Sequence, residues 1–103
     1  MCMEFLNKKC IIRSYGAGVF YGTITAKNDT AAGVEVELKD ARRIYYWAGA
    51  NTLSQLAVEG SKKPNECKIT IAVPEMIVTQ VMEIIPASEK AVKNLDGIRI
   101  WKY

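Results

Sequence analysis

The sequence contains no histidine, which removes the commonest general base of enzymes and a common ligand for zinc. A serine or cysteine triad in its usual form needs that base, so neither can be assembled from this chain. The chain also has no P-loop, no dinucleotide-binding glycine fingerprint and no G-x-S-x-G nucleophile motif. We therefore expect a protein that is not an enzyme and that uses no cofactor.

The sequence also lacks a long apolar run. The longest candidate, MIVTQVMEIIPA, is interrupted by Thr79, Gln80 and Glu83 and falls short of the ~20 apolar residues that a membrane helix needs. The N-terminus places an acid before its bases and has no apolar core followed by a small-residue cleavage site, so it does not resemble a secretory signal. These absences predict a protein of the cytoplasm that makes no use of a membrane.

Cysteine is scarce. Cys2, Cys10 and Cys67 form no C-x-x-C pair and are odd in number, which fits reduced thiols better than a disulfide framework. Cys10 and Cys67 lie in apolar, strand-like runs, where cysteine usually serves as a small core residue. Without histidine a zinc site would need scattered thiols and carboxylates, and no spacing here supports one, so we expect no metal.

An excess of one charge is missing too, since 14 bases against 11 acids leave a net charge of only +3. Duplex nucleic-acid binding usually depends on many phosphate contacts and shows a larger basic excess or a concentrated basic stripe. The remaining composition is that of a globular protein, with 103 residues of which half are apolar and 24% charged. We expect residues 1–103 to form a single domain that does not bind duplexes.

Alternating apolar residues predict most of the secondary structure. The runs CIIRS and VFYGTITAK, on either side of the glycine-containing turn YGAG, predict a β-hairpin. Further strands are expected over residues 34–40, 42–47, 67–73, 75–86 and 98–103. Pro74 cannot donate to a sheet ladder, so it predicts a sheet edge or a strand boundary before the long 75–86 strand.

Two short helices complete the expected fold. Asn51 can cap a helix over residues 52–59, and Ser88 can cap a second helix over residues 89–95. The apolar residues of the first helix recur at helical spacing and should pack on the sheet; they are Leu53, Leu56 and Ala57. The predicted fold class is α+β: a mostly antiparallel, curled or barrel-like sheet of about six or seven strands with two short helices.

The run ARRIYYWAGA combines two arginines with three aromatic residues. Alternate residues of a strand share a face, so Arg43, Tyr45 and Trp47 should project together, opposite the core face that Ile44 marks. Planar rings beside a planar cation suit a nucleobase with a nearby phosphate, because bases stack on aromatic rings and a guanidinium pairs with phosphate. Arg42 faces the other way in a regular strand and would need a bulge to join them.

The same run of residues is also typical of positions that bind no small ligand. Tyrosine and tryptophan are common in strands, aromatic pairs stabilise sheets, and an arginine often packs on an aromatic ring. Tyrosine, tryptophan and arginine are also the residues that are enriched at protein interaction hot spots. A core position, a subunit interface and a ligand site therefore all remain open for this run.

Two further stretches are candidates for the same site. In RSYGAGVFYG the glycines would let backbone amides approach a phosphate, Arg13 would supply charge, and Tyr15 or Tyr21 a stacking face. A hairpin turn by itself explains two of these glycines. Lys62 and Lys63 precede a proline in a polar loop and could reach an anionic ligand near the sheet, although such a pair is commonly just solvated.

Three stretches together resemble recurring segments of a known family: RSYGAGVFYG, ARRIYYWAGANTLSQLAVEGSKKP and VMEIIPASEKA. The family consists of small, mostly uncharacterised proteins encoded by tailed bacteriophages and prophages, and the resemblance covers residues 10–102. It supplies no catalytic residues, and it implies the host cytoplasm and an accessory role. Phage accessory proteins of this kind often bind and sequester something that the host uses, and one class traps nucleotide-derived immune signals.

The residues and the resemblance together predict a non-catalytic phage accessory protein that sequesters a small nucleotide-derived ligand, a sponge for host immune signals. The predicted ligand-binding residues are Arg13, Tyr15, Tyr21, Arg42, Arg43, Tyr45, Trp47, Lys62 and Lys63. We expect a homo-oligomer with sites near subunit contacts, because so short a chain has little room for a deep pocket. The alternatives are a protein interaction module that uses the aromatic patch and a single-stranded nucleic-acid binder.

Overall fold

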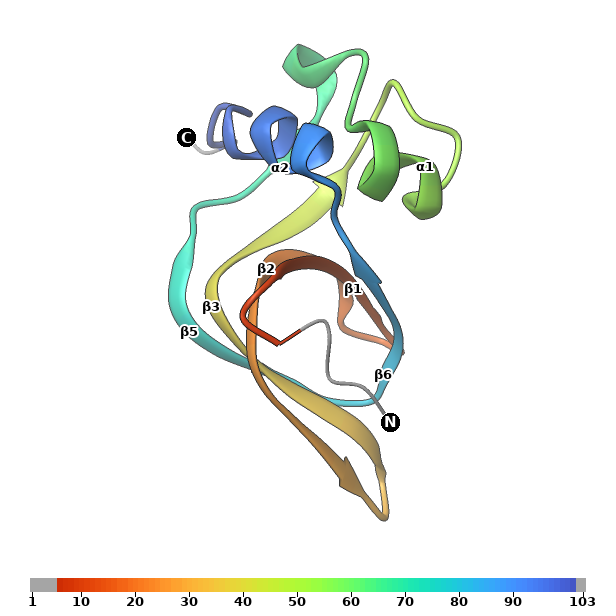
Figure 1. Ribbon diagram of the computed structural model, residues 1–103, viewed down its shortest axis with the longest axis vertical. Coiled ribbons are helices and arrows are strands. Elements are labelled where there is room, and N and C mark those ends of the chain that lie inside the picture. The colour runs from red at the N-terminus through yellow and green to blue at the C-terminus, as the bar shows by residue number, and fades with distance from the viewer. Residues whose placement is uncertain (1–5, 102–103) are drawn as a thin grey trace.

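The computed structural model describes residues 6–101 and has the predicted α+β fold (Figure 1). The elements are β1 (Lys9–Ser14), β2 (Gly18–Thr30), β3 (Gly33–Tyr46), α1 (Leu53–Glu59), the 3-10 helix η1 (Pro64–Glu66), β4 (Lys68–Ile69), β5 (Val73–Val78), β6 (Val81–Pro86) and α2 (Glu89–Asp96). All the strand pairings between these elements are antiparallel. In the described part of the chain, no helix is long and apolar enough to cross a membrane.

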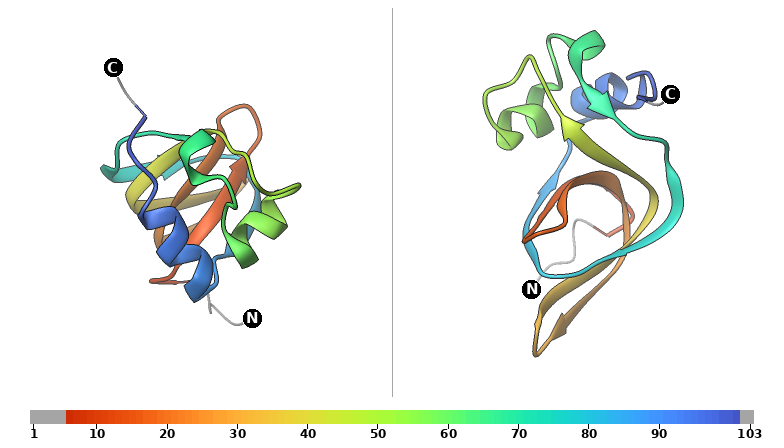
Figure 2. Two further views of the ribbon diagram at one scale, coloured as in Figure 1. Left: turned by 90° about the horizontal axis from the view of Figure 1, so that it is seen from above. Right: turned by 180° about the vertical axis from the view of Figure 1, so that it is seen from behind.

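The strands form one curled, six-stranded sheet in the order β4-β3-β2-β1-β6, with β5 also paired to β3. Strand β3 is long enough to pair with β5 along its first part and with β4 near its end. The consecutive strands β5 and β6 pair with opposite sides of the sheet, one with β3 and the other with β1. The sheet therefore curls strongly without closing into a continuous barrel (Figure 2).

Curling of the sheet produces two hydrophobic cores on its two faces. The core inside the curl consists of strand residues alone, namely Cys10, Ile12, Phe20, Ile24, Val36, Leu38, Ala41 and Val78. The core between the sheet and the helices contains Ile11, Tyr21, Ile44, Leu56, Ala57, Cys67, Ile69, Ala91, Leu95 and Ile98. Cys10 and Cys67 are thus core residues, as predicted, and they belong to different cores.

A bulge in β3 replaces the connection that was predicted between two strands at Asp40. Asp40 adopts a positive φ of 53°, and the register slips there, because Thr23 pairs with Lys39 while Tyr21 pairs with Arg42. The extra residue keeps the strand continuous and changes which residues face each core. After the bulge the predicted alternation holds over residues 42–45, with Arg42 and Ile44 buried and Arg43 and Tyr45 exposed.

Both helices begin with a side-chain cap and bury an apolar face. The predicted cap Ser88 is confirmed, since its hydroxyl accepts from the Ala91 N–H at 3.1 Å. The predicted cap Asn51 is wrong, because the first helix is capped by Thr52, whose hydroxyl accepts from the Gln55 N–H at 3.1 Å. The predicted contacts of α1 with the core are confirmed: Leu56 and Ala57 are buried and Leu53 packs beside them.

Three predicted strands are shorter or absent. Strand β4 has only two residues instead of residues 67–73, and the 75–86 strand is split into β5 and β6 at Gln80, whose φ is 53°. No strand covers residues 98–101, where an isolated bridge joins Ile100 to Ile69; residues 102 and 103 lie outside the described residues. The Thr70 carbonyl accepts from the side chain of Arg42, while the Ile69 carbonyl accepts both from Arg42 and from the Trp101 backbone N–H.

Candidate functional site

Tyr45 and Trp101 form an exposed stacked pair on the outside of the sheet. Their ring centroids are 5.0 Å apart and their planes are inclined by 14°. Tyr45 is 65% exposed and Trp101 45% exposed. The backbone N–H of Trp101 donates to the Ile69 carbonyl at 2.9 Å, so the segment after α2 lies beside β4. This pairing brings the Trp101 indole to Tyr45 of β3.

Lys68 of β4 adds a cation to this pair. Its ammonium nitrogen lies 5.5 Å from the centroid of the Trp101 ring, within the range of a cation–π contact. Lys68 reaches this position because β4 runs between β3, where Tyr46 is its ladder partner, and the segment after α2 that contains Trp101. The indole is therefore held by neighbours from two other segments while much of its surface remains open.

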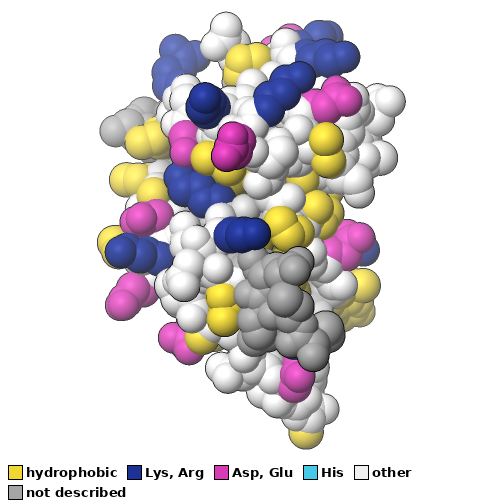
Figure 3. Space-filling model, viewed as in Figure 1, with side chains coloured by type: hydrophobic (Ala, Val, Ile, Leu, Met, Phe, Trp, Pro, Cys, Tyr) yellow, Lys and Arg dark blue, Asp and Glu magenta, His cyan; other side chains and the backbone are white. Residues whose placement is uncertain are grey.

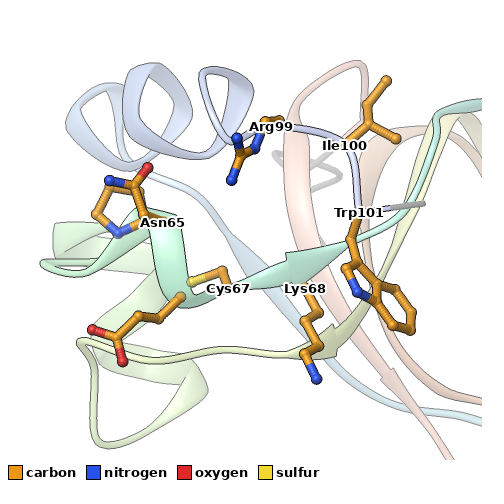
Figure 4. Close-up of a pocket in the computed structure, with 8 residues that line it drawn as sticks. Asn65, Cys67, Lys68, Arg99, Ile100 and Trp101 are labelled. Atoms are coloured by element: carbon orange, nitrogen blue, oxygen red, sulfur yellow. The ribbon is translucent and has the colours of Figure 1, made fainter. Parts of the chain in front are cut away.

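A groove of about 800 Å³ leads away from the indole (Figure 4). It lies between the η1–β4 segment and the segment after α2, and we call it the C-terminal groove; its lining residues are Pro64, Asn65, Glu66, Cys67, Lys68, Arg99, Ile100 and Trp101. Asn65 and Trp101 lie toward opposite ends of it, and Lys68 and Arg99 come from its two sides. The groove thus combines two cations, one carboxylate, an amide and an exposed ring.

Arg42 is a structural residue rather than part of this site. It is only 8% exposed, and its guanidinium donates to four backbone carbonyls: Thr70 at 2.8 Å, Ile98 at 3.0 Å, Leu95 at 3.2 Å and Ile69 at 3.3 Å. Burial lowers the pKa of this guanidinium. The donors that were predicted to bind a phosphate instead join β3 to the segment after β4 and to the end of α2.

Tyr21 also belongs to the interior, although it was predicted as a stacking face. It is 2% exposed, and its hydroxyl donates to the Asp96 carboxylate at 2.9 Å. Lys9 donates to both oxygens of the same carboxylate at 2.8 Å. Burial, followed by the hydrogen bond to Asp96, raises the pKa of the Tyr21 phenol above its ordinary value.

The predicted row of Arg43, Tyr45 and Trp47 does not exist as such. Strand β3 ends at Tyr46, and Trp47 turns back to pack, half-buried, against the core beneath the helices. Arg43 is exposed, but its guanidinium donates to the Ala17 carbonyl at 2.5 Å and lies 4.7 Å from the centroid of the Phe20 ring. Only Tyr45 of the three presents an open ring.

The remaining predicted site residues are spread over the surface. Tyr15 is 72% exposed in the turn between β1 and β2, and Arg13 is exposed and forms an ion pair with Glu83 at 2.7 Å. Lys62 and Lys63 are exposed and directly precede Pro64 of the C-terminal groove. Among the predicted cations these two lysines are therefore the ones that lie beside the groove.

Sequence reasoning missed Lys68, Arg99 and Trp101. Lys68 and Trp101 were each placed in a predicted strand, and their meeting depends on the pairing of two distant segments beside β4. The alternation of bases with apolar residues in IRIWKY was the available signal, because it set an aromatic ring next to cations. Within residues 6–101, no group of three or more histidine, cysteine and acidic residues could hold a metal ion.

Comparison with known proteins gives one match. Residues 7–95 match a family model described as "Domain of unknown function (DUF6948)". The matched residues include Tyr45 and Lys68 and stop before Arg99 and Trp101. No curated protein and no solved structure shows a significant match to the chain.

Proposed function

The chain belongs to the DUF6948 family, whose function is unknown, and from the geometry of its surface we propose that it binds and sequesters a nucleotide-derived ligand in the C-terminal groove without chemical turnover. The observation that supports this proposal best is the half-exposed indole of Trp101, backed by Tyr45 and accompanied by Lys68, at one end of a groove flanked by Arg99. This arrangement combines a surface for a base with charges for a phosphate.

Each part of a nucleotide would have a partner in the groove. A base stacked on an exposed aromatic ring gains about 1 to 3 kcal/mol. The stack with Tyr45 already orients the indole, so less side-chain freedom is lost on binding. Arg99 would pair with phosphate oxygens through its planar fork, and the Lys68 ammonium would move from the indole to a phosphate when a base replaces it. Lys62 and Lys63 would add charge at the rim.

Binding without chemistry is consistent with the groove's composition. The chain has no histidine to act as the usual general base, and the groove offers Glu66 as its one carboxylate. A protein of this kind acts by lowering the free concentration of its ligand. The resemblance to phage proteins supports a role in the host cytoplasm, with a host immune-signalling nucleotide as the ligand.

The proposal can be tested by thermal unfolding with a ligand panel of cyclic dinucleotides, mononucleotides, ADP-ribose derivatives and short oligonucleotides. A ligand at a hundredfold excess over its Kd stabilises the folded state by about 2.7 kcal/mol, so binding should raise the melting temperature. Trp101→Ala should abolish that shift. The matched control is Tyr15→Ala, which removes an exposed aromatic ring that lies outside the groove. A panel without any shift, or a shift that survives Trp101→Ala, would contradict the proposal.

A second candidate function, docking of a protein partner, is favoured by the apolar exposure around the same rings. Tyr46 and Ile100 are exposed and directly neighbour Tyr45 and Trp101 in the sequence. Aromatic residues with neighbouring aliphatic ones are typical of interaction hot spots. Two results together would support docking: no nucleotide in the panel binds the protein, and the Trp101→Ala variant no longer binds a protein partner that the parent protein binds.

A further inference from the structure

The stacked rings restrict the kind of nucleotide ligand that the groove can take. A pocket for a small ligand usually buries most of the ligand's surface. Here the rings of Tyr45 and Trp101 are already in contact, at a centroid distance of 5.0 Å, so no base fits between them. The groove is also partly open to solvent. A free nucleotide would be held from one side, which is poor enclosure for a small molecule.

The fold also concentrates charge that looks evenly spread in the sequence. We define the helical half as residues 42–69 and 87–101, which contains both helices, η1, β4 and the C-terminal groove. Its bases are Arg42, Arg43, Lys62, Lys63, Lys68, Lys90, Lys93 and Arg99, and its acids are Glu59, Glu66, Glu89 and Asp96. Bases are thus twice as frequent as acids in this half.

The rest of the described chain has the opposite balance. Its acids are Asp29, Glu35, Glu37, Asp40, Glu75 and Glu83, and its bases are Lys8, Lys9, Arg13, Lys27 and Lys39. The positive charge of the described chain therefore resides in the helical half. Figure 3 agrees, since most of the dark blue side chains on this face lie in its upper part, where Figure 1 shows the helices.

We infer that the ligand is a single-stranded nucleic acid that runs along the C-terminal groove, with its bases on Trp101 and its phosphates on the cations of the helical half. This inference rests on the proposed function. Proteins that bind single strands combine an electropositive groove that follows the backbone with aromatic rings on which bases stack from one side. An open groove suits such a ligand, because a strand gains affinity by adding contacts along its length.

The order of groups along the groove fits a strand of several nucleotides. Lys62 and Lys63 precede Pro64 near one end, Lys68 and Arg99 flank the middle, and Trp101 lies at the other end with Tyr45 behind it. A polyanion without bases, such as an acidic peptide, would use the same cations and leave the rings unused. The ring contacts are therefore what distinguishes a nucleic acid from other polyanions.

The test is a fluorescence anisotropy titration of the full chain with labelled oligothymidylates of about 4, 8 and 16 nucleotides, lengths that span known site sizes. We expect affinity to rise with length and then to level off, and to fall as salt concentration rises. Trp101→Ala should lower affinity about thirtyfold, which corresponds to the middle of the range for one stacked base. Lys68→Ala and Arg99→Ala should each lower the salt slope by about one unit or slightly less. Lys39→Ala, a cation outside the helical half, should change neither quantity.

A second measurement does not depend on a variant of the site. In a Trp47→Phe background, Trp101 is the one remaining tryptophan of the chain. Its fluorescence should be quenched when an oligothymidylate binds and should remain unchanged with poly-glutamate. Quenching would locate a base on the indole even if Trp101→Ala proved poorly folded.

The outcomes separate this inference from the proposed function. Thymidine monophosphate that binds as tightly as the longest strand would overturn the inference and leave the proposed function standing. Binding of poly-glutamate with the same affinity, or a strand affinity that is insensitive to Trp101→Ala and leaves the indole unquenched, would also overturn it. If neither the strands nor any member of the nucleotide panel binds, both proposals fail.

Discussion

Ser61 and Asn94 hold each other through two hydrogen bonds. The Ser61 N–H donates to Asn94 Oδ1 at 2.8 Å, and Asn94 Nδ2 donates to the Ser61 carbonyl at 2.8 Å. The Asn94 side chain, on α2, thus forms with the Ser61 backbone the two hydrogen bonds that a neighbouring strand would form. This loop continues through Lys62 and Lys63 to Pro64, which lines the C-terminal groove.

Asn94→Ala should destabilise the protein by roughly 2 kcal/mol, because it leaves both backbone groups of the buried Ser61 without a partner. Urea denaturation would measure the change. Asn65→Ala, in the exposed η1 segment, is the matched control and should stay within about 0.5 kcal/mol of the parent protein. Equal stability of the two variants would show that the Ser61 pairing contributes nothing.

Arg42→Met should lower the free energy of unfolding more than Arg43→Met does, although the two arginines are neighbours in the sequence. The first change removes a guanidinium that serves four carbonyls and should cost roughly 3 kcal/mol or more. The second removes one hydrogen bond and an exposed cation–π contact, worth about 1 kcal/mol. Chemical denaturation of both variants checks the order, and a larger loss for Arg43→Met would make Arg42 a candidate ligand-binding residue again.

Gly49 and Gly16 both have a φ of 81°, yet they should respond differently to alanine. A Cβ on Gly49 would lie 2.6 Å from the backbone nitrogen of Lys62 and 2.9 Å from Ser61 Oγ. A Cβ on Gly16 would meet nothing within 4 Å. Gly16→Ala should cost about 1 kcal/mol, which is typical of a left-handed conformation. Gly49→Ala should cost about 2 kcal/mol more, because backbone atoms must shift. Similar melting temperatures for the two variants would contradict the close approach of these loops.

Alkaline pH should destabilise the protein through Tyr21. Its pKa is raised in the folded state, so above pH ~10 the unfolded chain loses the phenolic proton first and binds fewer protons than the folded chain. The stabilisation is therefore complete below pH ~10 and is lost as the pH rises toward the folded pKa. Burial also raises the pKa of Cys10 to about 11, which adds a smaller loss in the same direction from pH ~9.

Unfolding free energies measured between about pH 9 and pH 11 test this expectation. The Tyr21→Phe variant should lose about 1 kcal/mol at neutral pH with its hydrogen bond, and its stability should fall less steeply above pH ~10. Tyr46→Phe, at an exposed tyrosine, should keep the steep alkaline loss of the parent protein. An identical pH profile for Tyr21→Phe and the parent would rule out the phenol as the cause.

Sequence patterns within a few consecutive residues correctly predicted the cap of α2 and the buried face of α1. Ser88 caps α2 as expected, because a hydroxyl at that position needs only the amides of the next turn. Leu56 and Ala57 bury the face of α1 that their spacing indicated. These features depend on a few consecutive residues, which is why they could be read without knowing the fold.

The candidate site could be predicted only in part. Tyr45 is exposed, as expected. Lys62 and Lys63 directly precede Pro64, which lines the C-terminal groove. Trp47 was paired with Tyr45 on the assumption that the strand continued, but β3 ends one residue earlier. The ring that does stack on Tyr45 is that of Trp101, which lies far along the sequence, near residue 103. No local pattern specifies such a partner, because the contact depends on how distant segments pair.

The sequence by itself determined an α+β fold with an antiparallel sheet and two capped helices, since periodicity and turn chemistry act over a few residues. Only the tertiary structure decided which carbonyls the Arg42 guanidinium serves and which ring stacks on Tyr45. The docking of residues 98–101 beside β4 brought the Ile98 carbonyl to the Arg42 guanidinium and placed Trp101 on Tyr45. Long-range pairing sets strand register, and a shift of one residue exchanges buried and exposed side chains.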